Sequence, residues 1–355
     1  MAYTSAKAKK SSSNRGIFPF CCLFGKKCVN LRSNLRIFMT VLESIEASSS
    51  PIFSFEILPP LKGNNIQRVF NVIDKLREFD PKYINITSHH SEAIYIPQPD
   101  GSHRRIVTRK RPGTVAIAAA IQQKYGIAAV PHIICKGFTR EETEYALIDL
   151  NFLGIENLLL LRGDSKSADT ANQDPALYNQ FATDLQAQVN DFNRGIGLDG
   201  TAVPGVDRPF AYGMACYPEK HEEAPNMEWE LQIARRKVEG GAQYLVTQMF
   251  FDNQKYYAFV EACRREGINV PIIPGIKPII KRDQLTVLPR VFGCEIPEAF
   301  AAELRSCKTD AEAVEAGVEW CTAQARDLIA HNVPGLHFYS LMASESVRRV
   351  CQNVF

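Results

Sequence analysis

Eight short apolar segments recur along the chain and restrict the folds that it can adopt. Most are nearly continuous runs of aliphatic and aromatic residues, a pattern typical of strands that are covered on both faces in a parallel sheet. The segments are FSFEIL (53–58), YINIT (83–87), AAVPHII (128–134), NLLLLRG (157–163), YGMACY (212–217), YLVTQMFF (244–251), PIIPGI (271–276) and GLHFYS (335–340).

Helical patterns lie between several of these segments. TREETEYALIDLNFLG begins with a capping box formed by Thr139 and Glu142, carries apolar residues at helical spacing and ends at Gly154. Residues 227–241 and 254–267 also end in basic side chains followed by glycine, as helices commonly do.

This alternation predicts an α/β fold, a (β/α)8 TIM barrel, over about 300 residues. An open doubly wound sheet is the alternative that the pattern leaves open. We assign residues 51–355 to one catalytic barrel domain and residues 1–50 to an N-terminal extension.

The extension differs in composition from the rest of the chain. Residues 1–38 contain eight lysines and arginines and no acidic residue, although the formal charge of the whole chain is only +2. The segment has neither the long apolar core nor the small-residue cleavage site of a secretory signal. We interpret it as an unstructured tail or as sequence upstream of a true start at Met39; a targeting or membrane-surface role is the alternative.

Composition indicates a soluble globular protein, with 45% hydrophobic and 23% charged residues. No apolar run approaches the ~20 residues that a membrane-spanning helix needs, so we expect no membrane partner. The near-neutral charge gives no reason to expect nucleic acid. Ten cysteines without a CxxC pair predict buried, reduced thiols and a cytoplasmic location.

Polar residues recur where the predicted strands end. In a TIM barrel the chemistry lies at the C-terminal ends of the strands. Each residue taken alone has a structural explanation, but burying several unpaired polar groups in one layer costs a few kcal/mol each, so the set indicates a functional site. The residues are Glu56, Thr87, His132, Arg162, Gly163, Asp164, Tyr217, Pro218, Glu219, Gln248 and Tyr339.

Two motifs match known sites only superficially. GIGLDG (195–200) has the spacing of a dinucleotide-binding loop, but a helical, polar stretch precedes it and no helix signal follows it, so we interpret it as an ordinary loop. SHHSE (88–92) has no second cluster of ligands at convincing spacing, so we predict no metal site. Nothing resembles a GxSxG nucleophile elbow.

Taken together, the strand-end motifs resemble the methylenetetrahydrofolate reductase family. The motifs occur in the family's order over residues 53–340, and the combination of YPE-H, TQ-FFD and PGI-P is specific. They are FSFEILPP, PHIICKGFTREE, LGIENLLLLRGD, ACYPEKHEEAP, RRKVEGGAQYLVTQMFFD, IIPGIKPI and GLHFYS. The chain ends soon after the eighth strand, so it resembles the bacterial, catalytic-domain-only form.

The resemblance implies a barrel that binds FAD without a Rossmann domain and uses NADH or NADPH as co-substrate. It implies reduction of 5,10-methylenetetrahydrofolate to 5-methyltetrahydrofolate, which supplies methyl groups for methionine synthesis. Glu56 is then the general acid that protonates the folate nitrogen on the aminobenzoate side and opens the one-carbon ring. An apolar strand suits this role, because desolvation disfavours the charged form of a carboxyl group.

The resemblance also implies binding residues and a homo-oligomer. The substrate-binding residues are Asp164, Gln248, Gln284 and, as an aliphatic lid, Leu288. The FAD-binding residues are Thr87, His132, Arg162, Gly163, Asp164, Ala182, Tyr217, His221, Glu230, Arg236 and Lys237. Arg236 and Lys237 are the expected partners of the pyrophosphate, with a solvated basic helix end as the structural alternative.

The chain departs from the family pattern at three places. These departures concern the affinity for cofactor and substrate more than membership of the family. SHH follows Thr87 where an aromatic residue is usual, Ile233 replaces a polar residue, and LMA replaces LNR after HFYS, which removes an arginine. Two other functions stay open. One is a barrel lyase, for which Lys277 is the only strand-end lysine available, and the other is a flavin- or folate-binding protein without turnover.

Overall fold

The computed structural model describes residues 38–163, 174–202, 206, 208–341 and 343–355. These residues belong to one compact unit of the chain, Ile37–Phe355, and the description below concerns that unit.

Eight parallel β/α units close into a barrel, so the predicted TIM barrel is confirmed and the open sheet is excluded. The sheet order is β10-β11-β1-β2-β5-β6-β7-β8-β9, in which all neighbouring strands are parallel. The strands are β1 (Ile52–Ile57), β2 (Tyr83–Ile86), β5 (Ala128–Ile134), β6 (Asn157–Leu161), β7 (Ala211–Cys216), β8 (Tyr244–Thr247), β9 (Ile272–Ile273), β10 (Gly275–Ile276) and β11 (Gly335–Leu341).

The short strands β9 and β10 act as one barrel strand that is interrupted at Pro274. β9 pairs with β8 and β10 pairs with β11. Proline has no N–H to donate, but the carbonyl of Pro274 still accepts a hydrogen bond from His337 N at 3.0 Å. The segment Ile272–Ile276 therefore joins the two ends of the sheet.

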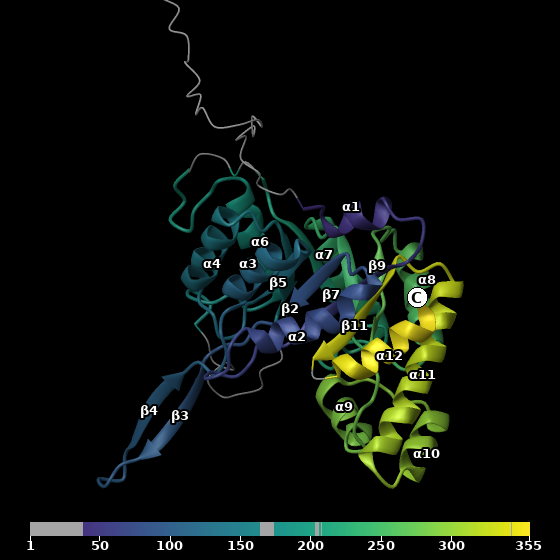
Figure 1. The fold of residues 1–355 in the computed structure, drawn as a ribbon. Helices are drawn as coiled ribbons and strands as arrows, with labels where there is room; N and C mark the ends of the chain where they lie inside the picture. Colours follow the sequence, from purple (N-terminus) through teal and green to yellow (C-terminus); the bar gives the residue numbers. More distant parts are fainter. Residues whose placement is uncertain (1–37, 164–173, 203–205, 207, 342) are drawn as a thin grey trace, which may run out of the picture. The chain divides into compact units, whose positions relative to one another are not determined.

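Helices follow the strands as predicted (Figure 1). The predicted capping box of α4 is confirmed, since Thr139 Oγ1 accepts from Glu142 N at 3.0 Å and Glu142 Oε2 accepts from Thr139 N at 2.9 Å. The α-helices are α1 (Val41–Glu46), α2 (Gln67–Leu76), α3 (Thr114–Tyr125), α4 (Arg140–Phe152), α6 (Ala182–Asn193), α7 (Met227–Glu239), α8 (Asn253–Arg265), α9 (Gln284–Phe292), α10 (Glu298–Ser306), α11 (Asp310–Ala330) and α12 (Ser344–Val354), and a 3-10 turn, η1 (Arg77–Phe79), follows α2. Within the described ranges, every helix is too short or too polar to cross a lipid bilayer.

An antiparallel hairpin, formed by β3 (Glu92–Pro97) and β4 (His103–Thr108), was not predicted. It is inserted between β2 and α3 and projects away from the barrel in Figure 1. β3 contains the apolar run AIYIP, β4 begins with three polar residues, and a Pro-Asp-Gly turn, whose Gly101 has a φ of 82°, joins them.

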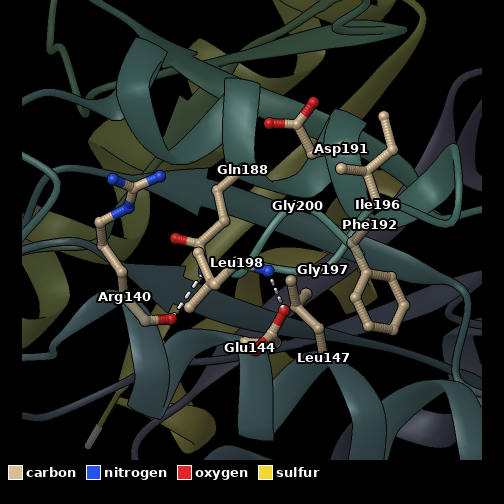
Figure 2. Close-up of a pocket in the computed structure, with 10 residues that line it drawn as sticks. All are labelled: Arg140, Glu144, Leu147, Gln188, Asp191, Phe192, Ile196, Gly197, Leu198 and Gly200. Atoms are coloured by element: carbon tan, nitrogen blue, oxygen red, sulfur yellow. Dashed lines mark hydrogen bonds between the residues drawn. The ribbon is translucent and has the colours of Figure 1, made fainter. Parts of the chain in front are cut away.

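The GIGLDG segment is a loop, as predicted. It follows α6, and Ile196 forms an isolated antiparallel bridge with Ala202. Leu198 N donates to Glu144 Oε1 of α4 at 2.8 Å, and the loop, α4 and α6 line a small cavity of ≈ 210 Å³ (Figure 2).

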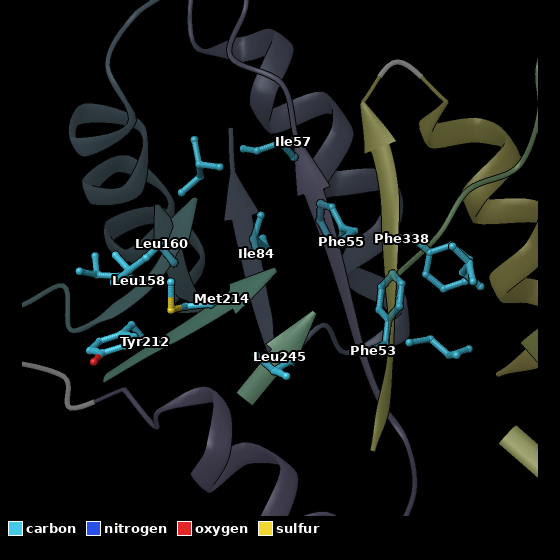
Figure 3. Close-up of a cluster of buried hydrophobic side chains, with 14 of the residues drawn as sticks. Phe53, Phe55, Ile57, Ile84, Leu158, Leu160, Tyr212, Met214, Leu245 and Phe338 are labelled. Carbon is cyan, nitrogen blue, oxygen red and sulfur yellow. The ribbon is translucent and has the colours of Figure 1, made fainter. Parts of the chain in front are cut away.

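Apolar side chains form one cluster outside the barrel wall and another inside it. On the outside, residues such as Phe55, Ile84 and Met214 pack in the main core (Figure 3). The seven cysteines within the described part of the chain are buried free thiols, as predicted.

The inner cluster joins the first residues of the strands to α1. Ile52, Tyr83 and Tyr244 pack there with Val41 of α1. The side chain of Asn157, at the start of β6, accepts from Val41 N at 3.0 Å and donates to Met39 O at 3.2 Å. Residues 38–46 thus cover the N-terminal end of the barrel.

We predict that Asn157→Ala lowers the free energy of unfolding by about 1–3 kcal/mol, because it leaves the buried N–H of Val41 without a partner. Chemical denaturation measures this loss. Asn71→Ala, which removes an exposed amide that pairs with Gln67 on α2, should change stability by less than about 0.5 kcal/mol. Equal effects of the two substitutions would contradict the proposed anchoring of α1.

Candidate active site

A cavity of ≈ 1130 Å³ opens at the C-terminal ends of the strands. This volume exceeds the roughly 300–1,000 Å³ of pockets that hold one drug-sized ligand. Twelve of the fifteen residues predicted to act in catalysis or binding line it, although they come from eight different strands, loops and helices. They are Glu56, Thr87, His132, Arg162, Gly163, Ala182, Tyr217, His221, Glu230, Arg236, Lys237 and Gln248.

Three predicted residues do not join this set. Asp164 lies outside the described residues. Gln284 begins α9, where its Oε1 accepts from Ile280 N at 2.7 Å, and Leu288 is 4% exposed in a separate apolar cluster with Phe300. Neither Gln284 nor Leu288 lines the cavity, so their contacts with a substrate stay predictions.

Glu56 is buried at the end of β1 and faces His132 of β5. Glu56 Oε2 lies 3.5 Å from His132 Nε2. Burial, with smaller contributions from the nearby His337 and His89, lowers the pKa of His132 to about 3, so the imidazole is neutral at physiological pH. The contact is therefore not an ion pair, and His132 supplies no positive charge that would hold Glu56 in its ionised form.

Lys277 is a second buried neighbour of Glu56. It is 5% exposed, and its Nζ donates to Tyr339 O at 3.3 Å. Burial lowers the pKa of Lys277, while the carboxylate of Glu56 raises it in part. Lys277 is absent from the described lining of the cavity, which disfavours a Schiff-base lyase because the nucleophile must reach its substrate.

Helix α7 presents one face to the cavity. Trp229, Ile233 and Arg236 line it at the i, i+4, i+7 spacing of a single helical face. Arg236 is exposed and has no ion-pair partner among the described residues, so its guanidinium is available to an anionic group.

Lys237, next in the chain, is held differently from Arg236. Its Nζ donates to Ala215 O at 2.7 Å, and burial lowers its pKa, which the nearby carboxylate of Glu230 partly raises. Glu230 is 2% exposed; its Oε2 accepts from His221 N at 3.2 Å, and its Oε1 is buried without a hydrogen-bond partner. An unpaired buried oxygen at a cavity wall suits a ligand that brings its own donor.

Gly163 lets the backbone turn sharply after β6. Its φ is 96°, a conformation that disfavours other residues, and a Cβ atom there would lie 3.4 Å from Lys136 Cβ. The preceding Arg162 pairs with Glu223 and lies over the ring of Phe181, with 5.2 Å between Cζ and the ring centroid. The ion pair orients the guanidinium along the cavity wall.

His221 is fixed in one neutral tautomer. Burial lowers its pKa, and Glu223 N donates to its Nδ1 at 3.2 Å, so the proton of the neutral ring is on Nε2. Its ring lies edge-on to Tyr217 at 4.8 Å. The pair offers one imidazole donor beside an aromatic wall.

Several cavity residues were missed by the sequence analysis. Phe181 and Trp229 are 55% and 46% exposed, and His89 and His90 lie at the base of the hairpin. The helical spacing of Trp229 from Arg236 was a usable signal. No comparable signal identified the histidines, because the inserted hairpin places them.

The fold and the site define a TIM-barrel protein with a large cavity at the C-terminal ends of its strands and a buried carboxyl group in the wall of that cavity. The sequence model of the methylenetetrahydrofolate reductase family matches residues 41–354, and the chain belongs to this family.

Known relatives agree in family but differ in length. The 5,10-methylenetetrahydrofolate reductase of Salmonella typhimurium is 27% identical over 302 residues, which cover 85% of this chain and 90% of the relative. Methylenetetrahydrofolate reductase 1 of Schizosaccharomyces pombe is 28% identical over 305 residues, which cover 85% of this chain and 45% of the relative. The chain thus spans about half the length of the yeast relative.

A solved structure supports the fold. A protein from Clostridium thermocellum, described as binding two copies of 5-methyl-5,6,7,8-tetrahydrofolic acid, has a TM-score of 0.52 at 14% identity and covers 88% of this chain and 98% of its own. At this identity the similarity concerns the fold alone.

A pH-dependent contribution to stability is expected from Glu219, beside the cavity. Its carboxylate accepts from Glu295 N at 3.2 Å, and burial raises its pKa from 4.5 to about 7. A raised carboxyl pKa stabilises the fold below pH 4.5, and this contribution disappears as the pH rises to about 7. The stability of Glu219→Gln relative to the wild type should therefore increase across this range, as thermal melts at several pH values measure.

For Glu223→Gln, we expect the stability relative to the wild type to change with pH in the opposite direction. The hydrogen bond from Arg162 lowers the pKa of Glu223, so its contribution is present above its unfolded value of 4.5 and is lost as the pH falls. A difference between Glu219→Gln and the wild type that does not change with pH would contradict the burial of Glu219.

Proposed function

We propose that this protein is an FAD-dependent reductase that converts 5,10-methylenetetrahydrofolate to 5-methyltetrahydrofolate with NADH or NADPH. The observation that carries the proposal is the buried Glu56 at the wall of a large cavity, in a chain that belongs to this family. When bound, FAD would supply the hydride that reduces the folate, after it has been reduced by the nicotinamide.

In this proposal Glu56 acts as the general acid. The carboxyl group gives its proton to the folate nitrogen on the aminobenzoate side, the bond from that nitrogen to the one-carbon bridge breaks, and the resulting iminium carbon accepts the hydride. The neutral state of His132 supports the role, because a cation 3.5 Å away would favour the carboxylate. Lys277 acts in the opposite sense, because a nearby ammonium group favours the ionised form of Glu56.

The cavity residues fit FAD in their chemistry. The guanidinium of Arg236 suits a pyrophosphate, and the Nε of Arg162 and the Oε1 of Glu230 are buried atoms without partners among the described residues. The residues that we expect to hold FAD, on the basis of the family resemblance, are Thr87, His132, Arg162, Gly163, Asp164, Ala182, Tyr217, His221, Glu230, Arg236 and Lys237.

Gln248 is the described residue best placed to contact the folate. It follows β8 at the cavity wall, and its Oε1 accepts from Met249 N at 2.9 Å, which leaves the amide NH₂ as a donor for a ligand. Asp164, Gln284 and Leu288 complete the proposed substrate contacts.

The wider assignments follow from the family and are proposals as well. We propose a role in one-carbon metabolism that supplies methyl groups for methionine synthesis, a cytoplasmic location and a homo-oligomer. Relatives named for NADH in Arabidopsis thaliana and for NADPH in Caenorhabditis elegans are similarly distant, at 27% and 25% identity, so the proposal includes both nucleotides.

Glu56→Gln tests the acid. Loss of the proton donor should slow reduction of methylenetetrahydrofolate by about 10²–10⁴-fold. Reduction of bound FAD by NADH or NADPH should stay near the wild-type rate, because that step needs no proton from Glu56. Anaerobic stopped-flow measurements of flavin absorbance separate the two steps.

Glu223→Gln is a matched control, since it makes the same change at another wall of the cavity. It should affect folate reduction far less than Glu56→Gln does. Full folate turnover by Glu56→Gln would exclude the proposed acid. A protein that binds no FAD would exclude the flavin-dependent reaction altogether, and flavin that is reduced but never reoxidised by the folate would indicate a binding protein without turnover.

Arg236→Gln tests the proposed FAD site. Loss of charge-assisted hydrogen bonds worth about 1.5–3 kcal/mol should weaken FAD binding by about 10- to 150-fold, as titration of the apoprotein with FAD measures. Arg235→Gln is the control, because Arg235 pairs with Glu239 on the same helix and does not line the cavity. Equal losses in the two variants would place the pyrophosphate elsewhere.

A further inference from the structure

The hairpin β3–β4 exposes apolar side chains on both of its faces. Ile94 and Ile106 are cross-strand partners on one face, and Ala93 and Val107 are partners on the other. Ile94, Tyr95 and Val107 are 46%, 54% and 51% exposed. An isolated two-stranded hairpin is marginally stable in water, and large exposed apolar groups on an edge favour association. The hairpin therefore has the properties of a docking arm.

Helix α4 exposes a complementary apolar stripe. Its inner face is buried through Leu147 and Leu150, while Tyr145, Ile148 and Phe152 on its outer face are 68%, 51% and 87% exposed. The three outer residues follow i, i+3, i+7 spacing and share one side of the helix. A helix that is apolar on two faces is typical of one that is covered on both.

The two surfaces carry opposite charge. Arg104 and Arg105 lie beside the apolar residues of β4, and Glu141 and Asp149 lie beside the apolar stripe of α4. Among the described residues, Arg104, Glu141 and Asp149 have no ion-pair partner. Opposite potentials on two apolar patches favour their association.

The surfaces also match in length. Six-residue strands extend about 20 Å, and a 13-residue helix has a length of about 20 Å. Within one chain, Arg109 at the base of the hairpin pairs with Glu142 at 3.1 Å, but the hairpin then projects away from α4 (Figure 1). The arm of one copy is thus directed away from its own helix.

We propose that the hairpin of one copy docks on the outer face of α4 of a second copy. A two-fold axis makes the contact reciprocal, so that two hairpins and two helices are covered in one closed dimer. Ser91, Glu92 and Ala93, at the base of the arm, line the barrel-mouth cavity, so docking of the arm fixes one wall of the site.

The position of the apolar residues argues against a membrane as the partner. The turn of the hairpin, residues 97–103, has the sequence PQPDGSH, and Ser102 donates to Asp100 there. An arm that inserts into a bilayer would carry apolar residues at its tip, whereas here they lie along the strands.

Charge reversal on the full-length chain tests the proposal. The wild type should be a dimer at micromolar concentration by sedimentation velocity. The pair Arg104→Glu and Arg105→Glu should raise the dimer dissociation constant at least about tenfold, as should the pair Glu141→Lys and Asp149→Lys. Arg104 and Arg105 lie on opposite faces of the hairpin, so whichever face docks places one of the new carboxylates against the acidic residues of α4. All four substitutions together should restore dimerisation.

Restored dimerisation in the variant with all four substitutions distinguishes the loss of a contact from a folding defect. Phe152→Asp should also dissociate the dimer, while Val291→Asp, an exposed apolar position on α9 outside both surfaces, should not. A monomeric wild type, a dimer that neither pair weakens, or a monomer that sediments with phosphatidylserine vesicles through Ile94 would each overturn the proposal.

Discussion

Closure of the sheet through the segment Ile272–Ile276 is the constraint on which the rest of the structure depends. Leu245 N donates to Pro271 O at 2.9 Å on one side, and His337 N donates to Pro274 O at 3.0 Å on the other. At the centre, Gly275 N donates to Thr247 Oγ1 at 2.9 Å, and a Cβ atom on Gly275 would lie 2.5 Å from Thr247 O. Only glycine allows this approach, and closure arranges the C-terminal ends of β1 and β8 around one mouth.

Closure also buries polar groups inside the barrel beneath that mouth, and this burial lowers the stability of the fold. Glu56 is in register with Asn85, whose side-chain amide is buried without a hydrogen-bond partner, and the Nε2 atoms of His132 and His337 are in the same state. Burying such groups costs a few kcal/mol each. Burial lowers the pKa of both histidines to about 3, so the interior around the carboxyl group contains neutral imidazoles. These buried polar groups thus lower the stability of the barrel. They lie where the proposed chemistry needs an acid in a weakly polar environment.

Much of the barrel could be predicted from the sequence, because strands buried on both faces produce apolar runs and because the capping residues of α4 are local. The hairpin was not found in this way, since both strands are largely exposed and β4 begins with the polar residues His103, Arg104 and Arg105, although β3 contains the apolar run AIYIP. Lys277 illustrates a second limit. Its place at a strand end could be predicted, but the position of its side chain relative to Glu56 depends on how two distant strands are aligned.

The predicted site residues likewise fall into two groups, those whose place at the cavity could be predicted from the sequence and those whose place could not. Residues that follow a strand directly, such as Thr87 and Gln248, could be placed at the cavity because every strand of a closed parallel barrel ends at one rim. Leu288 and Gln284 lie in the long excursion between β10 and α11, where no strand fixes the register, and they pack away from the cavity.

The insertion after β2 shows how such a barrel acquires new surfaces. Loops at the C-terminal rim tolerate additions because the strands below them carry the stability of the fold. The added hairpin begins at residues that line the cavity and ends in an apolar arm, so one insertion modifies both the site and the outer surface. In the proposed dimer, a change in how the arm is packed would be transmitted to His89 and His90 at its base, which would link association to ligand binding through the covalent chain.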